Sequence, residues 1–345
     1  MSAVQQALHC AAARQDLTER QANAAMLEIL RGESTSALTA AFLVALRMKG
    51  ETAGEVTGFA RAMRASATHV RPRNTPPDRL VDTCGTGGDG GGTFNVSTAA
   101  AFVVAGAGLA VAKHGNRSIS SRCGSADVLE ALGVNVKLDA GQSARAIDET
   151  GIGFLFAPSM HPAMRHAGPI RRELGMRTVF NMLGPLTNPA DAAIQVIGVY
   201  EDRIVPLAAQ ALARLGSKCA LVVHGSDGMD EITLTGTTRF AHVHAGGLRH
   251  GTLGPADFDL PPASADALAG GGPEKNSAIL RAVLSGEKGP ARDIVIINAG
   301  AALRVAGTAG SWAEGAALAA KSIDSGAAAA KLASLVAFSQ RFDAA

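Results

Sequence analysis

The chain has 345 residues, of which 47% are apolar and 18% are charged, and its formal net charge is +2. This composition describes a folded globular protein with one large or two unequal domains, and it excludes a disordered chain. The nearly balanced charge gives no basic surface of the kind that nucleic-acid-binding proteins carry, so we expect no nucleic-acid partner.

Cysteine spacing and the N-terminal residues favour a cytoplasmic protein. The four cysteines are scattered along the chain, at Cys10, Cys84, Cys123 and Cys219. They lack the spacing of a disulfide framework or a zinc knuckle. The first twenty residues lack the basic and apolar blocks of a secretory signal. The longest apolar stretch, 100–112, is broken by glycines and too short to span a bilayer, so we expect no membrane association.

Residues 1–74 predict a small all-helical domain of four helices. Capping-box patterns mark two of the helix starts, at Thr18-x-x-Gln21 and Thr52-x-x-Glu55. The third helix, over about 36–49, carries an apolar stripe wider than a lone surface helix needs. Ordinary core packing and a subunit interface both explain that stripe, and the sequence leaves the two open.

A proline-rich stretch at 72–78 breaks the helical pattern and predicts a domain boundary near residue 75. Beyond it, short β-branched runs alternate with alanine-rich helical segments, which is typical of βαβ units. We expect strands at 79–84, 109–115, 134–138, 194–200, 218–225, 240–245 and 291–300, an extended connection over 246–273 and a helical tail from 311. The sequence therefore predicts a larger α/β domain over 75–345, whose mainly parallel central sheet is flanked by helices.

A glycine-rich loop follows the first predicted strand, where residues 82–98 read DTCGTGGDGGGTFNVST. Each glycine weakens regular structure by roughly 0.5–1 kcal/mol relative to alanine, so the run indicates either a surface turn or a loop whose N–H groups approach an anion. The run also matches G-x-G-x-x-G, so a dinucleotide-binding loop is an alternative interpretation. The next strand, however, ends in KHGNR instead of the acidic residue that a dinucleotide ribose requires. Phosphate is the better match, and the P-loop signature is absent.

Donor groups gather around this loop. Asn95, Ser97 and Thr98 precede the next predicted helix, where hydroxyls and unpaired N–H groups favour an anion. The following strand ends in the cationic run 113–117. Because the ends of parallel strands meet at one edge of a sheet, we expect one concave, cationic site there.

An acidic turn, HGSDGMDEIT at 224–233, follows another predicted strand. Taken alone, it is as well explained by a solvated surface turn. Carboxylates that face a phosphate loop would repel its ligand unless a cation lies between them, and Mg²⁺ is the usual cation. The turn therefore predicts a metal ion.

The segment 154–189 mixes prolines with arginines, at Arg165, Arg171, Arg172 and Arg177. Arginine forks match planar carboxylates in a bidentate way. From sequence alone, each of these arginines is equally a solvated surface charge.

Taken together, these segments resemble the anthranilate phosphoribosyltransferase family, among the nucleoside phosphorylase-like (type III) phosphoribosyltransferases. The resemblance covers most of the chain and rests on GTGGD (85–89), NVST (95–98), KHGNR (113–117), GSADVLEALG (124–133), HPAMRHAGPIRRELGMRTVFNMLGPLTNP (161–189) and HGSDGMDE (224–231). It implies transfer of the 5-phosphoribosyl group from phosphoribosyl pyrophosphate (PRPP) to the amine of anthranilate, in tryptophan biosynthesis. It also implies a homodimer through the helical domain, with helices from about 168–190 packing on that domain.

The resemblance also implies individual contacts. PRPP contacts are expected at Gly85, Gly87, Gly88, Asp89, Thr93, Asn95, Ser97, Thr98, Lys113, Asn116 and Ser125. Anthranilate contacts are expected at Gly85, His114, Asn116, His161 and Arg171. Two Mg²⁺ ions are expected, with ligands among Ser97, Asp230 and Glu231. No dedicated acid or base is expected, since an aromatic amine is neutral at pH 7, so His114, Asn116 and Arg171 would position the reactants.

Two positions depart from the family's pattern. Met164 stands where some relatives carry an aromatic residue in the acceptor channel, and Cys123 stands where serine is common. Three alternatives stay open: a pyrimidine nucleoside phosphorylase, which shares the architecture and uses free phosphate, a paralogue with another acceptor, and a paralogue that binds nucleic acid.

Overall fold

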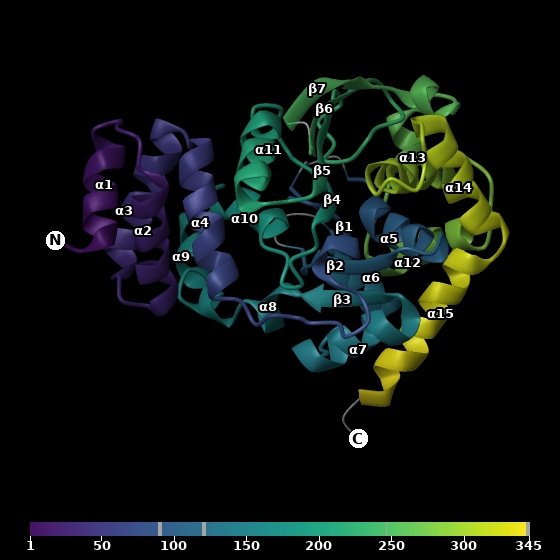
Figure 1. Cartoon of the computed structure of the whole chain (residues 1–345), viewed down its shortest axis with the longest axis horizontal. Coiled ribbons are helices and arrows are strands. Elements are labelled where there is room, and N and C mark those ends of the chain that lie inside the picture. The colour runs from purple at the N-terminus through teal and green to yellow at the C-terminus, as the bar shows by residue number, and fades with distance from the viewer. Residues whose placement is uncertain (89–91, 119–121, 246, 343–345) are drawn as a thin grey trace.

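The structure is a computed structural model that describes residues 1–88, 92–118, 122–245 and 247–342. Its N-terminal part is a bundle of four helices, α1 (Ala3–Ala12), α2 (Glu19–Arg31), α3 (Ser36–Lys49) and α4 (Ala53–Ala65). The predicted capping boxes begin α2 and α4, because Thr18 and Thr52 each accept the backbone N–H three residues on. Figure 1 shows the bundle at one end of the molecule.

A seven-stranded sheet with the order β3-β2-β1-β4-β5-β6-β7 fills the middle of the molecule. Its strands are β1 (Leu80–Gly85), β2 (Ala110–Gly115), β3 (Ile152–Phe156), β4 (Ile194–Gly198), β5 (Cys219–Gly225), β6 (Thr238–His244) and β7 (Gly247–Leu253). Strands β1 to β5 are parallel to one another, and β6 and β7 add antiparallel to β5. The structure confirms the predicted fold class, a small helical domain with a larger α/β domain.

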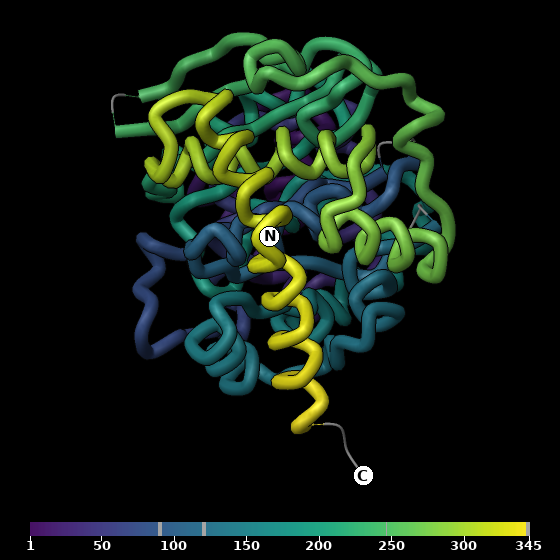
Figure 2. Tube along the Cα trace, turned by 90° about the vertical axis from the view of Figure 1, so that its right-hand side faces the viewer, coloured from purple at the N-terminus to yellow at the C-terminus, as the bar shows by residue number. Residues whose placement is uncertain are grey.

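Helices cover both faces of the sheet. The remaining helices are α5 (Val96–Gly106), α6 (Ser125–Ala131), α7 (Ala140–Thr150), α8 (Ala157–Met160), α9 (Gly168–Leu174), α10 (Phe180–Leu183), α11 (Ile204–Leu215), α12 (Pro273–Leu284), α13 (Pro290–Val305), α14 (Trp312–Asp324) and α15 (Ala327–Ser339). Helix α5 packs on β1 and β2 and is covered in turn by α13 and α15, so its residues 98–105 are all buried. Figure 2 shows α15 running along the outside of this layer toward the C-terminus. In the described ranges, no helix has both the length and the apolar character needed to cross a bilayer.

The bundle and the sheet share a continuous apolar core. Phe42 and Phe59 of the bundle belong to the same buried cluster as Val205 of α11 and Val222 of β5. Helix α11 packs against α4, while the short helices α9 and α10 contact α3 and α4 respectively. The segment 168–183 thus lies between the bundle and the sheet, which places it beside the ends of the parallel strands.

Three expectations about elements were wrong. Residues 291–300, expected as a strand, lie within α13, which is buried almost all round, so its continuous apolar run carries no helical periodicity. Residues 134–138 alternate between buried and exposed as a strand would, but they form an irregular segment. The stretch 246–273, expected as an extended connection, includes β7. Strand β3 was not anticipated at all.

The crossing of α2 and α4 depends on a glycine. A Cβ at Gly58 would lie 2.3 Å from the Glu19 carbonyl oxygen and 2.9 Å from Ala22 Cβ. We expect Gly58→Ala to lower the free energy of unfolding by about 1–3 kcal/mol, because the two helices must separate. The control is Gly54→Ala on the same helix, whose Cβ would lie 3.6 Å from its nearest neighbour and which should be neutral or stabilising by up to about 1 kcal/mol. Urea denaturation of both variants measures the difference, and equal effects would contradict this account of the crossing.

Candidate active site

The glycine loop begins where β1 and β4 end side by side. Gly85 and Gly198 are partners in the parallel register, and the acidic turn after β5 passes directly over both. A Cβ at Gly198 would lie 1.5 Å from the Asp230 carbonyl oxygen, and one at Gly85 would lie 2.3 Å from Asp230 Oδ2. Any side chain at these two positions would therefore displace the acidic turn from the strand ends.

Two carboxylates of this turn face the backbone N–H groups that the sequence assigns to an anion. Asp230 Oδ2 accepts from the Gly87 N–H at 2.7 Å, and Glu231 Oε1 accepts from the Ser97 N–H at 3.0 Å. Ser97 lies in the first turn of α5, where the helix dipole favours negative charge. The loop, the start of α5 and the acidic turn therefore meet at one place.

Asp227, in the same turn, has a different role. Its carboxylate accepts from the Thr233 and Thr235 hydroxyls, each at 2.6 Å, and from the Met229 N–H at 3.1 Å. These hydrogen bonds hold the pKa of Asp227 below its usual range against the effect of burial. Asp227 thus shapes the turn, which leaves Asp230 and Glu231 facing the glycine loop and α5.

Lys113 lies beneath the site, inside the sheet. Its side chain is buried, and its Nζ donates to the Thr83 carbonyl at 2.6 Å and to Ser97 Oγ at 3.4 Å. Burial lowers the pKa of Lys113, while the buried Asp82 carboxyl opposes that shift. The amine of Lys113 therefore contacts the first turn of α5 from below.

Asp82 is a site residue that the sequence did not reveal. It is fully buried, and burial raises its pKa. Its carboxyl accepts from the His114 N–H at 3.1 Å and from Asn188 Nδ2 at 2.8 Å. Asn188 also donates to the Ala112 carbonyl, so the pair ties the 161–189 segment to β1 and β2. The available signal was a charged residue inside a buried, mainly apolar strand.

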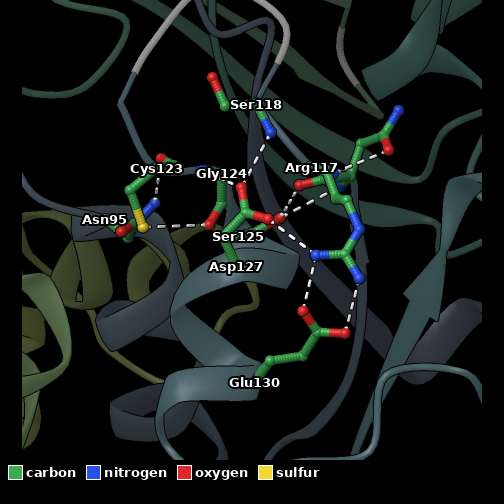
Figure 3. Close-up of polar contacts among 9 residues, drawn as sticks. Asn95, Arg117, Ser118, Cys123, Gly124, Ser125, Asp127 and Glu130 are labelled. Carbon is green, nitrogen blue, oxygen red and sulfur yellow. Dashed lines mark hydrogen bonds and ion pairs between the residues drawn. The ribbon is translucent and has the colours of Figure 1, made fainter. Parts of the chain in front are cut away.

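A second loop connects β2 with α6, and Figure 3 shows its contacts. The Asn116 N–H donates to Ser125 Oγ at 3.1 Å, and Ser125 Oγ donates to the Asn116 carbonyl at 3.2 Å. The Asp127 carboxylate accepts from the Ser118 and Gly124 N–H groups. Gly124 is required here, because its Cβ would lie 2.3 Å from the Ser118 nitrogen. The two ends of this loop are thus fastened to the start of α6.

The structure does not bring Arg117 into the cationic site expected over 113–117. Its guanidinium forms a bidentate pair with Glu130, at 2.6 Å to each oxygen, and also donates to Asp127 at 2.9 Å (Figure 3). Both acids lie on α6. The acidic residues of GSADVLEALG therefore hold Arg117 away from the anion site.

Asn95 is tied to the loop that carries Cys123, whose thiol is not activated as a nucleophile. Asn95 Nδ2 donates to the Cys123 carbonyl (Figure 3). Asn95 Oδ1 accepts from Asn276 Nδ2, so Asn95 braces the loop. Burial raises the pKa of the Cys123 thiol to about 11, which keeps it protonated at neutral pH. Thr93 pairs with Ala269 in an isolated bridge, and the buried Thr98 hydroxyl has no partner among the residues that the structure describes.

Two buried histidines, one of them next to Lys113 in the chain, lie with their rings close together. The rings of His114 and His161 have centroids 5.1 Å apart. His114 Nδ1 lies 3.1 Å from the Gly184 carbonyl, and His161 bonds to the backbone of Thr187. A carbonyl only accepts, so the bonded nitrogen carries the proton and each Nε2 is an acceptor. Both Nε2 atoms are buried without a partner in the described structure.

Arg171 is a cation with an open guanidinium fork. It lies on α9 with its guanidinium carbon 5.3 Å from the Phe180 ring centroid, and burial lowers its pKa. Among the ion pairs of the described residues, none includes Arg171. An Arg fork without a carboxylate suits an anionic ligand.

Contacts at the strand ends thus join four of the expected PRPP-binding residues, Gly85, Gly87, Ser97 and Lys113, with the expected metal ligands Asp230 and Glu231. His114 and His161 form a second group, and Asn116 with Ser125 a third. Asp89 lies outside the described residues. No hydrogen bond connects Arg171 to the histidines, so its part in the site is a prediction.

Comparison with known proteins gives the family. The helical bundle domain of the glycosyl transferase family matches residues 5–67, and the a/b domain of that family matches 77–329. The anthranilate phosphoribosyltransferase of Moorella thermoacetica is 57% identical over 94% of this chain and 95% of its own length. The enzyme of Rubrobacter xylanophilus is 53% identical over 98% of each chain. The chain belongs to the anthranilate phosphoribosyltransferase family.

Solved structures of the anthranilate phosphoribosyltransferase family share the whole fold. The crystal structure from Thermus thermophilus aligns with a TM-score of 0.91 at 47% identity, over 99% of this chain and 100% of that one. A structure from Saccharomyces cerevisiae, in complex with PRPP and Mg, aligns with a TM-score of 0.89 at 30% identity, over 98% of each chain. The similarity therefore includes the bundle, the sheet and the segment between them.

The buried histidines predict a pH-dependent stability. Burial lowers the pKa of His114 to about 3 and that of His161 to about 4. Below pH 6.5 the unfolded chain takes up protons that the folded protein does not bind, so the free energy of unfolding should fall as the pH drops. Between pH 7 and pH 5 we expect a loss of about 2 kcal/mol per histidine. Urea denaturation at both pH values should show a smaller loss for His161→Gln than for the wild type, and equal losses would contradict the prediction.

Proposed function

We propose that this chain transfers the 5-phosphoribosyl group from PRPP to the amine of anthranilate, which gives N-(5-phosphoribosyl)anthranilate and pyrophosphate in tryptophan biosynthesis. One observation carries the proposal: the carboxylates of Asp230 and Glu231 lie on the N–H groups of Gly87 and Ser97. An acidic pair beside an anion-binding loop is what a ligand composed of phosphate and Mg²⁺ requires.

The donor would bind at the glycine loop and the start of α5. The N–H groups that now donate to carboxylate oxygens present the same geometry to phosphate oxygens. Lys113 adds a positive charge from below, since its Nζ already contacts Ser97 Oγ. The proposed PRPP contacts are Gly85, Gly87, Gly88, Asp89, Thr93, Asn95, Ser97, Thr98, Lys113, Asn116 and Ser125.

The chemistry of the acidic turn fits Mg²⁺. Carboxylate and hydroxyl oxygens are hard ligands, and Mg²⁺ in such sites is held by one or two carboxylates together with substrate phosphates. In the described ranges no three His, Cys, Asp or Glu side chains gather to form a metal cage, so substrate oxygens would complete the coordination. We propose two ions, held by Asp230, Glu231 and Ser97. When bound, Mg²⁺ would neutralise charge on the pyrophosphate.

The acceptor would be held by Arg171, His114, Asn116 and His161, with Gly85 bordering it. The free guanidinium fork of Arg171 matches the anthranilate carboxylate. The Nε2 atoms of the two histidines are acceptors, so they suit the N–H bonds of an amine. With a pKa of about 3, His114 holds a proton poorly, and we assign it to positioning.

Transfer then needs mainly orientation and electrostatic stabilisation. The neutral amine nitrogen forms its bond to C1 of the ribose while the bond from C1 to the pyrophosphate oxygen breaks. The ammonium that results loses its proton after the bond has formed. The residues of this site align the amine with C1 and stabilise the negative charge of the leaving group.

Assembly and location complete the proposal. We propose a homodimer through the helical bundle, where Met48 of α3 is 71% exposed. We also propose a cytoplasmic enzyme, because all four cysteines carry free thiols. The defining experiment mixes the purified protein with PRPP, Mg²⁺ and anthranilate and follows the loss of anthranilate fluorescence. Phosphorolysis of a pyrimidine nucleoside without that loss would overturn the proposal.

Arg171 gives the first test. Arg171→Ala should weaken the use of anthranilate by roughly 1.5–3 kcal/mol in kcat/KM, because a charge-assisted pair is lost. The use of PRPP should change much less. The exposed Arg172 on the same helix is the matched control, and Arg172→Ala should leave both values near those of the wild type. Steady-state kinetics with each substrate varied would refute the assignment by showing equal losses.

The acidic pair gives the second test. The double variant Asp230→Asn and Glu231→Gln can still accept the Gly87 and Ser97 N–H bonds, but it loses both charges. We expect the Mg²⁺ concentration for half-maximal activity to rise by about tenfold or more. Asp227→Asn is the control, since Asp227 serves the turn and should not move that concentration. An unchanged Mg²⁺ dependence in the double variant would remove the metal site from Asp230 and Glu231.

A further inference from the structure

The glycine loop cannot fix its own conformation. Gly87 and Gly88 both have positive φ angles, 67° and 74°, and from Gly85 to Gly88 the only side chain is that of Thr86. Glycine has more backbone freedom to lose than any other residue, so this segment is ordered only by contacts from outside. Which contacts hold it therefore decides whether its N–H groups point toward the donor.

Three of those contacts come from the sheet edge and the acidic turn. The Thr86 N–H donates to the Gly198 carbonyl at 2.9 Å, and the Tyr200 N–H donates to Thr86 Oγ1 at 3.0 Å. The Gly87 N–H donates to Asp230 Oδ2. These bonds fasten Thr86 and Gly87, but none of them reaches Gly88.

The contact at Gly88 comes from Arg177. Arg177 Nη2 donates to the Gly88 carbonyl, and its guanidinium carbon lies 4.1 Å from the Tyr200 ring centroid. Tyr200 is only 7% exposed and lies directly beyond β4, so its ring is a fixed platform. A guanidinium on the face of an aromatic ring is held electrostatically, and here its fork is aimed at the loop.

Arg177 also belongs to the segment that connects the bundle with the sheet. It lies between α9 and α10, six residues beyond Arg171, in the segment that separates the bundle from the sheet. The Tyr200 ring is close enough to Arg47 and Glu51, at the end of α3, for their charges to act on its hydroxyl, although burial is the main cause of its raised pKa. The contact with Gly88 thus joins the donor loop to the segment between the two parts of the fold.

We propose that Arg177 is a positioning residue that holds the PRPP-binding glycine loop in its binding conformation, using Tyr200 as its support. This inference rests on the proposed function for its substrate. Arg177 touches the loop backbone and not the reacting atoms, so it acts on donor binding and not on the chemical step.

The test compares Arg177→Ala with Arg172→Ala, which removes the same charge from the same segment. Arg177→Ala should raise the KM for PRPP by about 5- to 20-fold, with kcat and the KM for anthranilate changed by less than about twofold. Arg172→Ala should leave the KM for PRPP unchanged. Equal rises in both KM values, or a fall in kcat alone, would overturn the proposal.

The role of Tyr200 gives a second kinetic test. Tyr200→Phe keeps the ring and should retain a low KM for PRPP, whereas Tyr200→Leu should raise it as Arg177→Ala does. The double variant of Arg177→Ala with Tyr200→Leu should have a KM for PRPP no higher than that of either single variant, because both changes remove the same contact between Arg177 and the Tyr200 ring. Fully additive effects would show that the ring does not act through Arg177.

A readout without substrates separates this proposal from the proposed function. Hydrogen exchange of the peptide that covers residues 82–94 should become faster in Arg177→Ala and stay unchanged in Arg172→Ala. If the wild type failed to use PRPP and anthranilate, the proposed function would fall while this exchange result still decided the role of Arg177. Unchanged exchange in a folded Arg177→Ala protein would refute the positioning role.

Discussion

The close approach of the Asp230 backbone to the ends of β1 and β4 is the constraint on which the site depends. A carbonyl oxygen that would lie 1.5 Å from a Cβ at Gly198 leaves room for hydrogen alone. This approach brings the carboxylates of Asp230 and Glu231 onto the N–H groups of the loop and of α5. Four distant stretches of the chain meet there because the carboxyl ends of parallel strands lie at the same edge of the sheet.

The charges of the site are arranged in layers around that approach. Lys113 and Asp82 lie inside the sheet, where the opposite charge of each lowers the cost of burying the other. Asp82 is also bonded to Asn188, so the buried pair is tied to the segment that carries Arg171 and Arg177. The acidic pair faces the glycine loop and the start of α5, which Lys113 also contacts. Fixed charges of alternating sign suit a ligand that carries phosphate together with a metal ion.

The sequence predicted whatever depends on local chemistry. Capping residues predicted the helices of the bundle, and the glycine run predicted the loop at the end of β1, whose anionic ligand stays a prediction. The sequence-based prediction was wrong where tertiary packing determines the secondary structure. The apolar run of α13 reads as a strand because a helix buried on all sides loses its amphipathic period, and residues 134–138 alternate like a strand although no neighbouring strand pairs with them. The Asn188 contact of Asp82 and the Gly88 contact of Arg177 each join residues more than eighty positions apart, which no local pattern records.

Three arginines show why residue type alone does not assign a role. Arg117 has Glu130 and Asp127 within reach and forms an ion pair on α6. Arg177 contacts an aromatic ring and a backbone carbonyl of the glycine loop. Arg171 is partly buried against Phe180, and among the described residues it has no carboxylate partner. Burying a cation is costly until an anion joins it. A carboxylate ligand at Arg171 would therefore relieve a cost that the fold already carries, which is how a protein makes one position selective for an acid.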